Sequence, residues 1–424
     1  MISKRRLQFK LGETREKITP SSGLALFGEY ALAVGLKEAA EKAFPAPLSG
    51  RGFKAFDYVF PLILMLHAGG RHLEDIRKIK NDPGLRKLLK LEVVPTADAI
   101  GDWLRRHGEE GVKKIEKINK ALIEEWLKDG GGEGLTLDID ATLAKAEKKE
   151  AELSYKGERG YFPMLGHLKE TGLILEFEFR KGNESPGSGN LEFYRKCKGM
   201  LPKGKRIKHF RADSASYQAA LLDELEEDGV KYAVGADLDC AVRETIKTIK
   251  PERYVKYRDG EAADAIHIMN KSKYPFRLTA FRKFRERSLF EKDGFDYHVY
   301  ATNREEESAA EVLEFYFHRG EDSENRLKEL KLDFGMESLP CGQFEANALF
   351  FSIACLAYNF YKMFVRSALP KSFWRSRALT VRYHIYNIGG KIVETARALF
   401  LKVSKESLEL FEEIRRRICM IRDG

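Results

Sequence analysis

A short segment of alternating apolar and polar residues constrains the fold of this 424-residue chain more than any other feature. From Leu135 to Asp140 the odd positions are apolar, and the even positions hold Thr136, Asp138 and Asp140. This alternation is typical of a β-strand with one apolar face. The two aspartates therefore share the opposite face, where the strand ends. Periodicity alone leaves either Asp138 or Asp140 as the functional carboxylate.

A second aspartate follows another short strand. The run Ile207–Asp213 is basic, then briefly apolar, and ends in an acid, and the segment Ser216–Leu222 that follows has helical spacing. Open sheets commonly place functional groups at such strand-to-helix junctions. We expect Asp213 to lie at the end of a strand, as Asp140 does.

A third acid, Glu324, precedes a run of cations. The preceding loop, Gly320–Ser323, ends in a helix N-cap residue, and Glu324, Lys328 and Lys331 are spaced to share one side of a helix. A solvated helix face has a similar composition. The two upstream aspartates favour a functional interpretation, because two aspartates and a glutamate are the oxygen ligands that Mg²⁺ prefers. Two such ions about 3.5–4 Å apart stabilise both oxygens of an in-line phosphoryl displacement.

These residues give the chain a resemblance to the DDE-class insertion-sequence transposases of bacteria and archaea. Asp-Ala-Thr and Arg-Ala-Asp-Ser motifs surround the two aspartates. The third acid of that family lies in a Tyr-Arg-Glu-Lys signature, which Tyr316, Arg319, Glu324 and Lys331 match here. The Glu-to-Lys spacing agrees with the signature, whereas one additional residue separates the arginine from the glutamate.

The resemblance implies a metal-dependent DNA endonuclease that cuts transposon ends and joins the 3′ ends to target DNA. By this resemblance, the catalytic metal ligands are Asp140, Asp213 and Glu324. The ion is Mg²⁺, for which Mn²⁺ substitutes. Phosphate-binding roles fall to Tyr316, Arg319 and Lys331, and helical spacing alone adds Lys328. The implied partners are double-stranded DNA and, in the DNA complex, a second copy of the chain.

Other functions remain open from the sequence. An RNase H-like nuclease would cut without strand transfer. A non-catalytic DNA-binding descendant would explain the altered spacing between Arg319 and Glu324. A hydrolase with a pair of catalytic acids does not explain the cations around Glu324.

The predicted fold class is α/β, with an RNase H-like mixed-sheet core, a β-rich insertion and helical regions at both ends. The first and fourth core strands lie side by side in such a fold, which would join Asp140 and Asp213 across 73 residues (213 − 140). We expect a helical region for DNA-end binding and assembly, a core in two parts separated by the insertion, and a helical region for DNA contact or dimerisation. The N-terminal region comprises residues 1–130, the core 131–240 and 295–365, the insertion 241–294, and the C-terminal region 366–424. Within the N-terminal region we expect helices at Leu24–Ala43, Ala55–Ala68, Ala97–His107 and Val112–Lys128.

Composition agrees with a nucleic-acid partner. The net charge is +9, and each cation that neutralises a phosphate releases a counterion. Basic and aromatic residues interleave at Phe281–Arg287 and Phe373–Arg377. The five cysteines lack metal-site spacing, and because the basic stretch Met1–Leu11 has no apolar run, we expect no secretory signal. The apolar run Ala348–Phe364 is expected to be a buried helix rather than a membrane span. We therefore expect a cytoplasmic protein.

Overall fold

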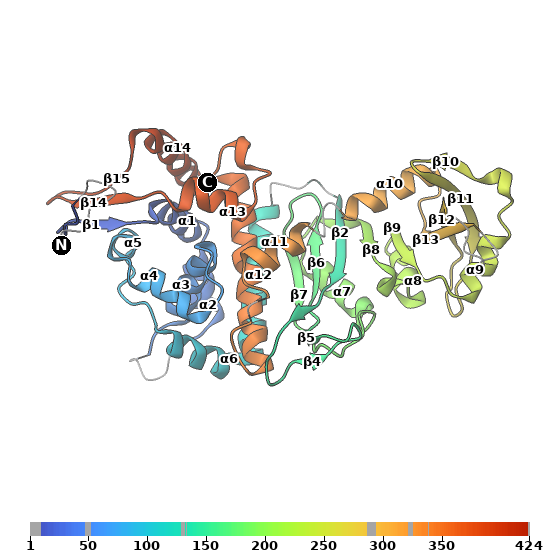
Figure 1. Ribbon diagram of the computed structural model, residues 1–424, viewed down its shortest axis with the longest axis horizontal. Helices are drawn as coiled ribbons and strands as arrows, with labels where there is room; N and C mark the ends of the chain where they lie inside the picture. The colour runs from blue at the N-terminus through green and yellow to red at the C-terminus, as the bar shows by residue number, and fades with distance from the viewer. Residues whose placement is uncertain are drawn as a thin grey trace, which may run out of the picture.

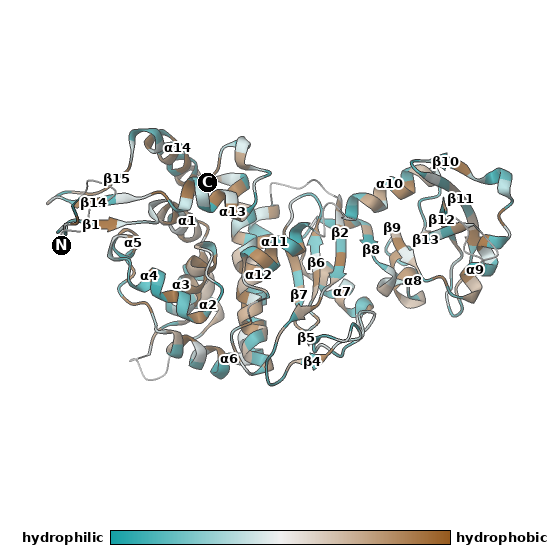
Figure 2. Cartoon of the chain, in the orientation of Figure 1, coloured by the Kyte–Doolittle hydropathy of each residue, from teal (hydrophilic) through white to brown (hydrophobic). Residues whose placement is uncertain are grey.

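The computed structural model describes residues 10–46, 52–128, 132, 134–285, 294–320, 325–337 and 339–422. Figure 1 shows an elongated molecule with a helical region at one end, a sheet in the middle and the insertion at the other end. The apolar residues gather where helices meet each other and the sheet (Figure 2).

A nine-stranded mixed sheet forms the core, in the order β10-β11-β12-β13-β9-β8-β2-β6-β7. Only the β2–β8 and β8–β9 pairs are parallel. The first and fourth core strands, β2 and β8, are neighbours as predicted. The strands are β2 (Gly134–Ala141), β6 (Met164–Leu168), β7 (Ile174–Glu178), β8 (Arg206–Ala212), β9 (Lys231–Ala236), β10 (Val255–Tyr257), β11 (Gly260–His267), β12 (Phe276–Phe284) and β13 (Phe295–Thr302).

The insertion extends this sheet instead of forming a separate one. It begins with α9 (Cys240–Lys247), and β10, β11 and β12 continue the sheet beyond β13. Strand β13 pairs antiparallel with the core strand β9, which agrees with the predicted return to the core sheet. Helix α10 (Ala309–Arg319) then runs back toward the core across β12, β11 and β9.

Two helices connect the core strands. α7 (Asn190–Met200) packs on β6 and β7, and α8 (Ala219–Glu227) packs on β9. Helix α8 follows Asp213, as the helical spacing predicts. Helix α7 was not predicted, because its apolar stripe is narrow: Phe193, Tyr194 and Cys197 are buried among charged neighbours.

The N-terminal region is helical, as predicted, but some of its helices begin and end at other residues than expected. The expected helix from Leu24 to Ala43 is divided into α1 (Ser22–Ala33) and α2 (Leu36–Ala43) at Gly35, whose φ is +84°. Conversely, two expected helices form the single kinked helix α6 (Ala97–Leu127), with the kink at Gly108. The remaining helices are α3 (Ala55–His67), α4 (Ile76–Lys80) and α5 (Pro83–Leu88).

Helix α12 (Phe344–Ser367) is the predicted apolar helix, and it is buried between α6, α3 and the sheet. It is long and apolar enough to cross a membrane, yet 94% of its most apolar window is buried inside the protein. Asn359 and Asn119 donate to the carbonyl of Ile174, and Asn359 accepts from the Ile174 N–H. These bonds satisfy backbone groups at the open edge of the sheet.

The C-terminal region contains a β-hairpin that the sequence analysis did not anticipate. β14 (Gly390–Glu394) and β15 (Leu399–Lys402) form a three-stranded sheet with β1 (Lys17–Thr19). They lie between the helical segments α13 (Ala378–Val381) and η6 (Arg382–Tyr386) and helix α14 (Lys405–Arg422). The hairpin thus joins the two ends of the chain. All five cysteines are free.

Candidate active site at the ends of two parallel strands

The side chains of Asp140 and Asp213 come from neighbouring strand ends. Ile139 of β2 lies opposite Ala212 of β8 in the parallel register, so the next residue of each strand is an aspartate. Parallel neighbours are about 4.8 Å apart. Asp213 also caps the short helix after β8, accepting a hydrogen bond from the N–H of Ala215 at 3.1 Å. The fold therefore brings these two predicted site residues together at one edge of the core.

Asp138 has a different environment from Asp140, although both lie on the same face of β2. The Asp138 side chain is fully buried, and both of its oxygens accept hydrogen bonds from Arg211 at 2.7 Å. Burial raises the pKa of Asp138, and Arg211 opposes that effect. The Asp140 side chain retains 14% exposure. This geometry favours Asp140 over Asp138 as the functional carboxylate.

Arg319, at the end of α10, lies over the end of β2. Its Nη2 is 3.2 Å from Oδ2 of Asp140 and donates to the carbonyl of Ile139 at 3.3 Å. Its side chain is only 10% exposed. Its buried Nε has no hydrogen-bond partner within the described part of the chain. Arg319 thus neutralises one candidate carboxylate and keeps one donor unused.

Tyr316 lies one helical turn before Arg319 and beside the end of β8. Burial raises the pKa of its hydroxyl, Arg319 opposes this, and Asp213 and Asp140 add to it. A methyl group placed on Gly235 of β9 would lie 3.1 Å from the Ser214 nitrogen and 3.3 Å from the Tyr316 hydroxyl. Gly235 therefore provides the room in which Tyr316 approaches the backbone next to Asp213.

Helix α11 (Asn325–Asp333) carries the predicted lysines. Nζ of Lys331 donates to the carbonyl of Leu143 at 2.9 Å, in the segment that follows β2. Burial lowers the pKa of Lys331, and the carboxylates of Glu337 and Asp140 oppose that shift. Lys328 is exposed. The apolar residues Leu327, Leu330 and Phe334 are buried. The structure therefore places Lys331 near Asp140 and leaves Lys328 facing solvent.

Glu324 lies outside the described residues, immediately before α11 begins at Asn325. Within the described ranges, no group of three His, Cys, Asp or Glu side chains is placed to hold a metal ion. The described site therefore contains two of the three predicted carboxylates.

Three polar residues of the site were missed from the sequence. Arg211 holds Asp138, and His167 of β6 lies 3.7 Å from the same carboxylate. Burial and the nearby arginines lower the pKa of His167 well below its usual value. Arg326 donates to the carbonyls of Leu168 and Lys169, which fixes α11 to the β6–β7 turn.

The period of a strand gives the face on which Arg211 lies, and the strand register then supplies its partner. In a strand, residues two positions apart share a face, so Arg211 faces the same side as Asp213, as Asp138 does relative to Asp140. The register pairs Asp138 with Arg211 directly. The buried ion pair of Asp138 and Arg211 therefore lies two residues before the two candidate carboxylates, on the same face of the neighbouring strands.

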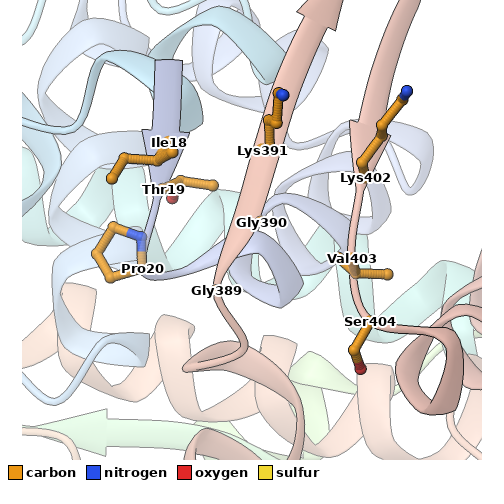
Figure 3. Close-up of a pocket in the computed structure, with 9 residues that line it drawn as sticks. All are labelled: Ile18, Thr19, Pro20, Gly389, Gly390, Lys391, Lys402, Val403 and Ser404. Atoms are coloured by element: carbon orange, nitrogen blue, oxygen red, sulfur yellow. The ribbon is translucent and has the colours of Figure 1, made fainter. Parts of the chain in front are cut away.

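One hollow in the described structure lies away from these carboxylates. It has a volume of about 650 Å³, is lined by β1, β14 and the end of β15, and includes neither Asp140 nor Asp213. Lys391 and Lys402 extend from neighbouring strands at its rim (Figure 3).

Comparisons with known proteins give one family and a similar solved structure. A family model described as "Transposase DDE domain group 1" matches residues 3–420. The search of curated proteins finds no match. Among solved structures, the chain is similar to the cryo-EM structure of a piggyBac transposase synaptic complex with hairpin DNA. That similarity has 12% identity and a TM-score of 0.43, covering 95% of this chain and 80% of the other.

Proposed function

The chain belongs to the transposase DDE domain group 1 family, and from this premise we propose that it cuts DNA at the ends of a mobile element and joins the 3′ ends to target DNA. The observation that carries this proposal is the adjacency of Asp140 and Asp213 at the ends of β2 and β8, beneath Arg319. Phosphodiester chemistry needs negative ligands for metal and positive groups for phosphate at one place.

The donor chemistry of the site fits divalent magnesium. The Asp140 and Asp213 carboxylates are hard oxygen donors, and neither is enclosed in the way that Asp138 is. Glu324 would supply the third carboxylate. Arg326 and Lys331 fix α11, which follows Glu324 directly, to the β6–β7 turn and to the segment after β2. When bound, two Mg²⁺ ions, or Mn²⁺ in their place, would activate water or a 3′ hydroxyl and stabilise the leaving oxygen.

The cationic residues of the signature then position DNA. Arg319 holds Asp140 in place and puts positive charge beside the carboxylates, where a phosphate would approach. The Tyr316 hydroxyl remains protonated because its pKa is raised, so it is able to donate a hydrogen bond to phosphate. Lys331 holds the segment after Asp140, and the exposed Lys328 meets the DNA backbone. We further propose that the chain acts in the cytoplasm as a homodimer on two paired DNA ends.

The test uses labelled DNA from the flanks of the gene and a supercoiled target plasmid. Purified protein in Mg²⁺ is expected to nick the labelled ends and join them to the plasmid, and EDTA is expected to abolish both reactions. Asp213→Ala and Glu324→Ala should lose both activities. Glu305→Gln, which changes an exposed acid on the loop before α10, is the matched control and should retain them.

Three outcomes would contradict parts of this proposal. Cutting without joining would identify a nuclease without strand transfer. Binding without cutting would identify a non-catalytic descendant, which the additional residue between Arg319 and Glu324 favours. Metal-dependent cutting by Asp213→Ala and Glu324→Ala would show that other residues carry the chemistry.

A further inference from the structure

The stretch that contains the buried helix α12 and the residues that follow it has an unusual charge pattern. Between Glu345 and Glu394 the sequence contains no aspartate or glutamate. The same stretch contains seven lysines and arginines: Lys362, Arg366, Lys371, Arg375, Arg377, Arg382 and Lys391. A third of the whole chain is charged, with nearly balanced signs, so this stretch departs from the surrounding composition. Any carboxylate that pairs with these cations must therefore come from another part of the chain.

Part of that charge remains unbalanced on the surface. Arg366 and Lys371 lie over the ring of Trp374, at 5.3 and 5.7 Å from its centroid. Arg366, Lys371 and Arg375 are exposed. In the described ranges no carboxylate lies within ion-pair distance of these three cations, whereas Arg377 and Arg382 pair with Asp333. Trp374 therefore holds two uncompensated cations in fixed positions.

The backbone under these cations is firmly anchored. Arg382 is buried and donates to the carbonyls of Leu66 and His67, at 2.9 and 2.7 Å. The N–H of Ala378 donates to Glu329 at 2.8 Å, which ties the segment to α11. This is the helix that carries Lys328 and Lys331. The segment thus presents its surface in a defined orientation relative to the candidate active site.

The same segment exposes two large side chains that a solvated loop would not require. Leu379 is 60% exposed and Tyr383 is 76% exposed, while the neighbouring Ala378, Val381 and Arg382 are buried. A tyrosine hydroxyl donates to phosphate oxygens, and apolar side chains pack against deoxyribose. Cations, a hydroxyl and apolar carbon on one anchored segment of the chain offer groups complementary to a sugar–phosphate chain.

We propose that Arg366, Lys371, Arg375, Leu379 and Tyr383, called here the 366–384 surface, dock the backbone of double-stranded DNA. The choice of partner rests on the function proposed above, and the surface itself rests on the charge and exposure described. Its contacts are with phosphate and sugar, so it binds without sequence preference. Its connection to α11 places the docked duplex alongside the helix that follows Glu324.

The test measures equilibrium binding to a labelled duplex of arbitrary sequence by fluorescence anisotropy, in EDTA so that no cleavage occurs. Salt is varied between about 50 and 200 mM. A plot of log K against log salt has a negative slope. In the double variant Lys371→Ala/Arg375→Ala this slope should become less steep by about two, because each phosphate contact contributes about 0.9 to its magnitude. Tyr383→Ala should weaken binding without changing the slope.

The matched control is Lys203→Ala/Arg253→Ala, which removes one exposed lysine from the loop after α7 and one exposed arginine from the insertion. It should leave the slope near that of the unmodified protein. Equal slopes for the two double variants would overturn the docking surface while leaving the proposed function intact. A change of oligomeric state in sedimentation velocity, with DNA binding unaltered, would also overturn it and would assign the surface to a second copy. If the unmodified protein binds no DNA at low salt, both proposals fail.

Discussion

The guanidinium of Arg319 lies 3.2 Å from a carboxylate oxygen of Asp140, although 179 residues separate them (319 − 140). The contact joins the end of α10 to the end of β2, so it fixes the helix that carries Tyr316 and Arg319 beside the strands that carry the two aspartates. It also reduces the negative charge that a DNA phosphate would meet on approaching Asp140.

Replacing Arg319 tests whether this cation acts in the reaction. Arg319→Ala should lower the single-turnover rate of DNA cleavage by about 100- to 1000-fold, the usual cost of losing one positioned donor to a transition state. Arg319→Lys should restore little, because an ammonium cannot keep both contacts of the guanidinium. Arg253→Ala, an exposed arginine in the insertion, is the control. Equal rates for Arg319→Ala and Arg253→Ala would exclude a role in catalysis.

The buried Asp138–Arg211 pair should contribute to stability more than to chemistry. Arg211 also donates to the carbonyl of Phe315 at 3.0 Å, so it links both strands to α10. Arg211→Met leaves Asp138 buried and unpaired, and urea unfolding should show a loss of about 3–5 kcal/mol. Arg195→Met breaks the exposed pair with Glu224 and should have a much smaller effect. Similar losses for both variants would contradict this assignment.

Glu176 makes the stability depend on pH. Burial, followed by the nearby Glu116 carboxylate, raises the pKa of Glu176 from 4.5 to about 7. The folded protein therefore keeps a proton on Glu176 that the unfolded chain loses. The contribution of this protonated group to the free energy of unfolding is complete below pH 4.5 and is lost as the pH rises through 7. Glu176→Gln cannot ionise, so it should be more stable than the unmodified protein at pH 8, by roughly 3 kcal/mol at most. The difference should vanish near pH 4; an unchanged difference there would refute the explanation.

Gly235 should be intolerant of a side chain because of its place beside the site. In Gly235→Ala the new methyl would press on the Ser214 nitrogen and the Tyr316 hydroxyl. We expect DNA cleavage to fall at least tenfold while circular dichroism stays unchanged, because the displacement is local. Gly199→Ala in α7 adds a methyl with no heavy atom within 4 Å, so it should keep full activity. Full activity of Gly235→Ala would show that Tyr316 need not occupy its observed position.

Local patterns predicted much of the fold that holds the site. The alternation up to Asp140 and the junction after Asp213 were sufficient to predict two strand ends, and the strand order brought them together. The longest apolar run correctly predicted a buried helix. These features are local or follow from a known strand order, which is why one sequence is enough to predict them.

Features that depend on distant partners were not predicted. The pairing of β1 with β14 joins residues from opposite ends of the chain, and no local period indicates such a contact. Arg211 resembles any strand-end arginine until Asp138 is placed opposite it. At Gly108 a kink with non-helical backbone angles replaced an expected break, and the start of α12, at Glu345, packs against this glycine. Glu324, outside the described residues, remains a prediction from the sequence.

The central claim is that Asp140 and Asp213 together hold divalent metal. The most direct measurement is Mn²⁺ binding by electron paramagnetic resonance in the unmodified protein, Asp140→Asn, Asp213→Asn and the control Glu305→Gln. Each aspartate variant should bind Mn²⁺ at least tenfold more weakly, because the lost carboxylate was a ligand, while the control binds as the unmodified protein does. Unchanged Mn²⁺ affinity in both aspartate variants would contradict the account.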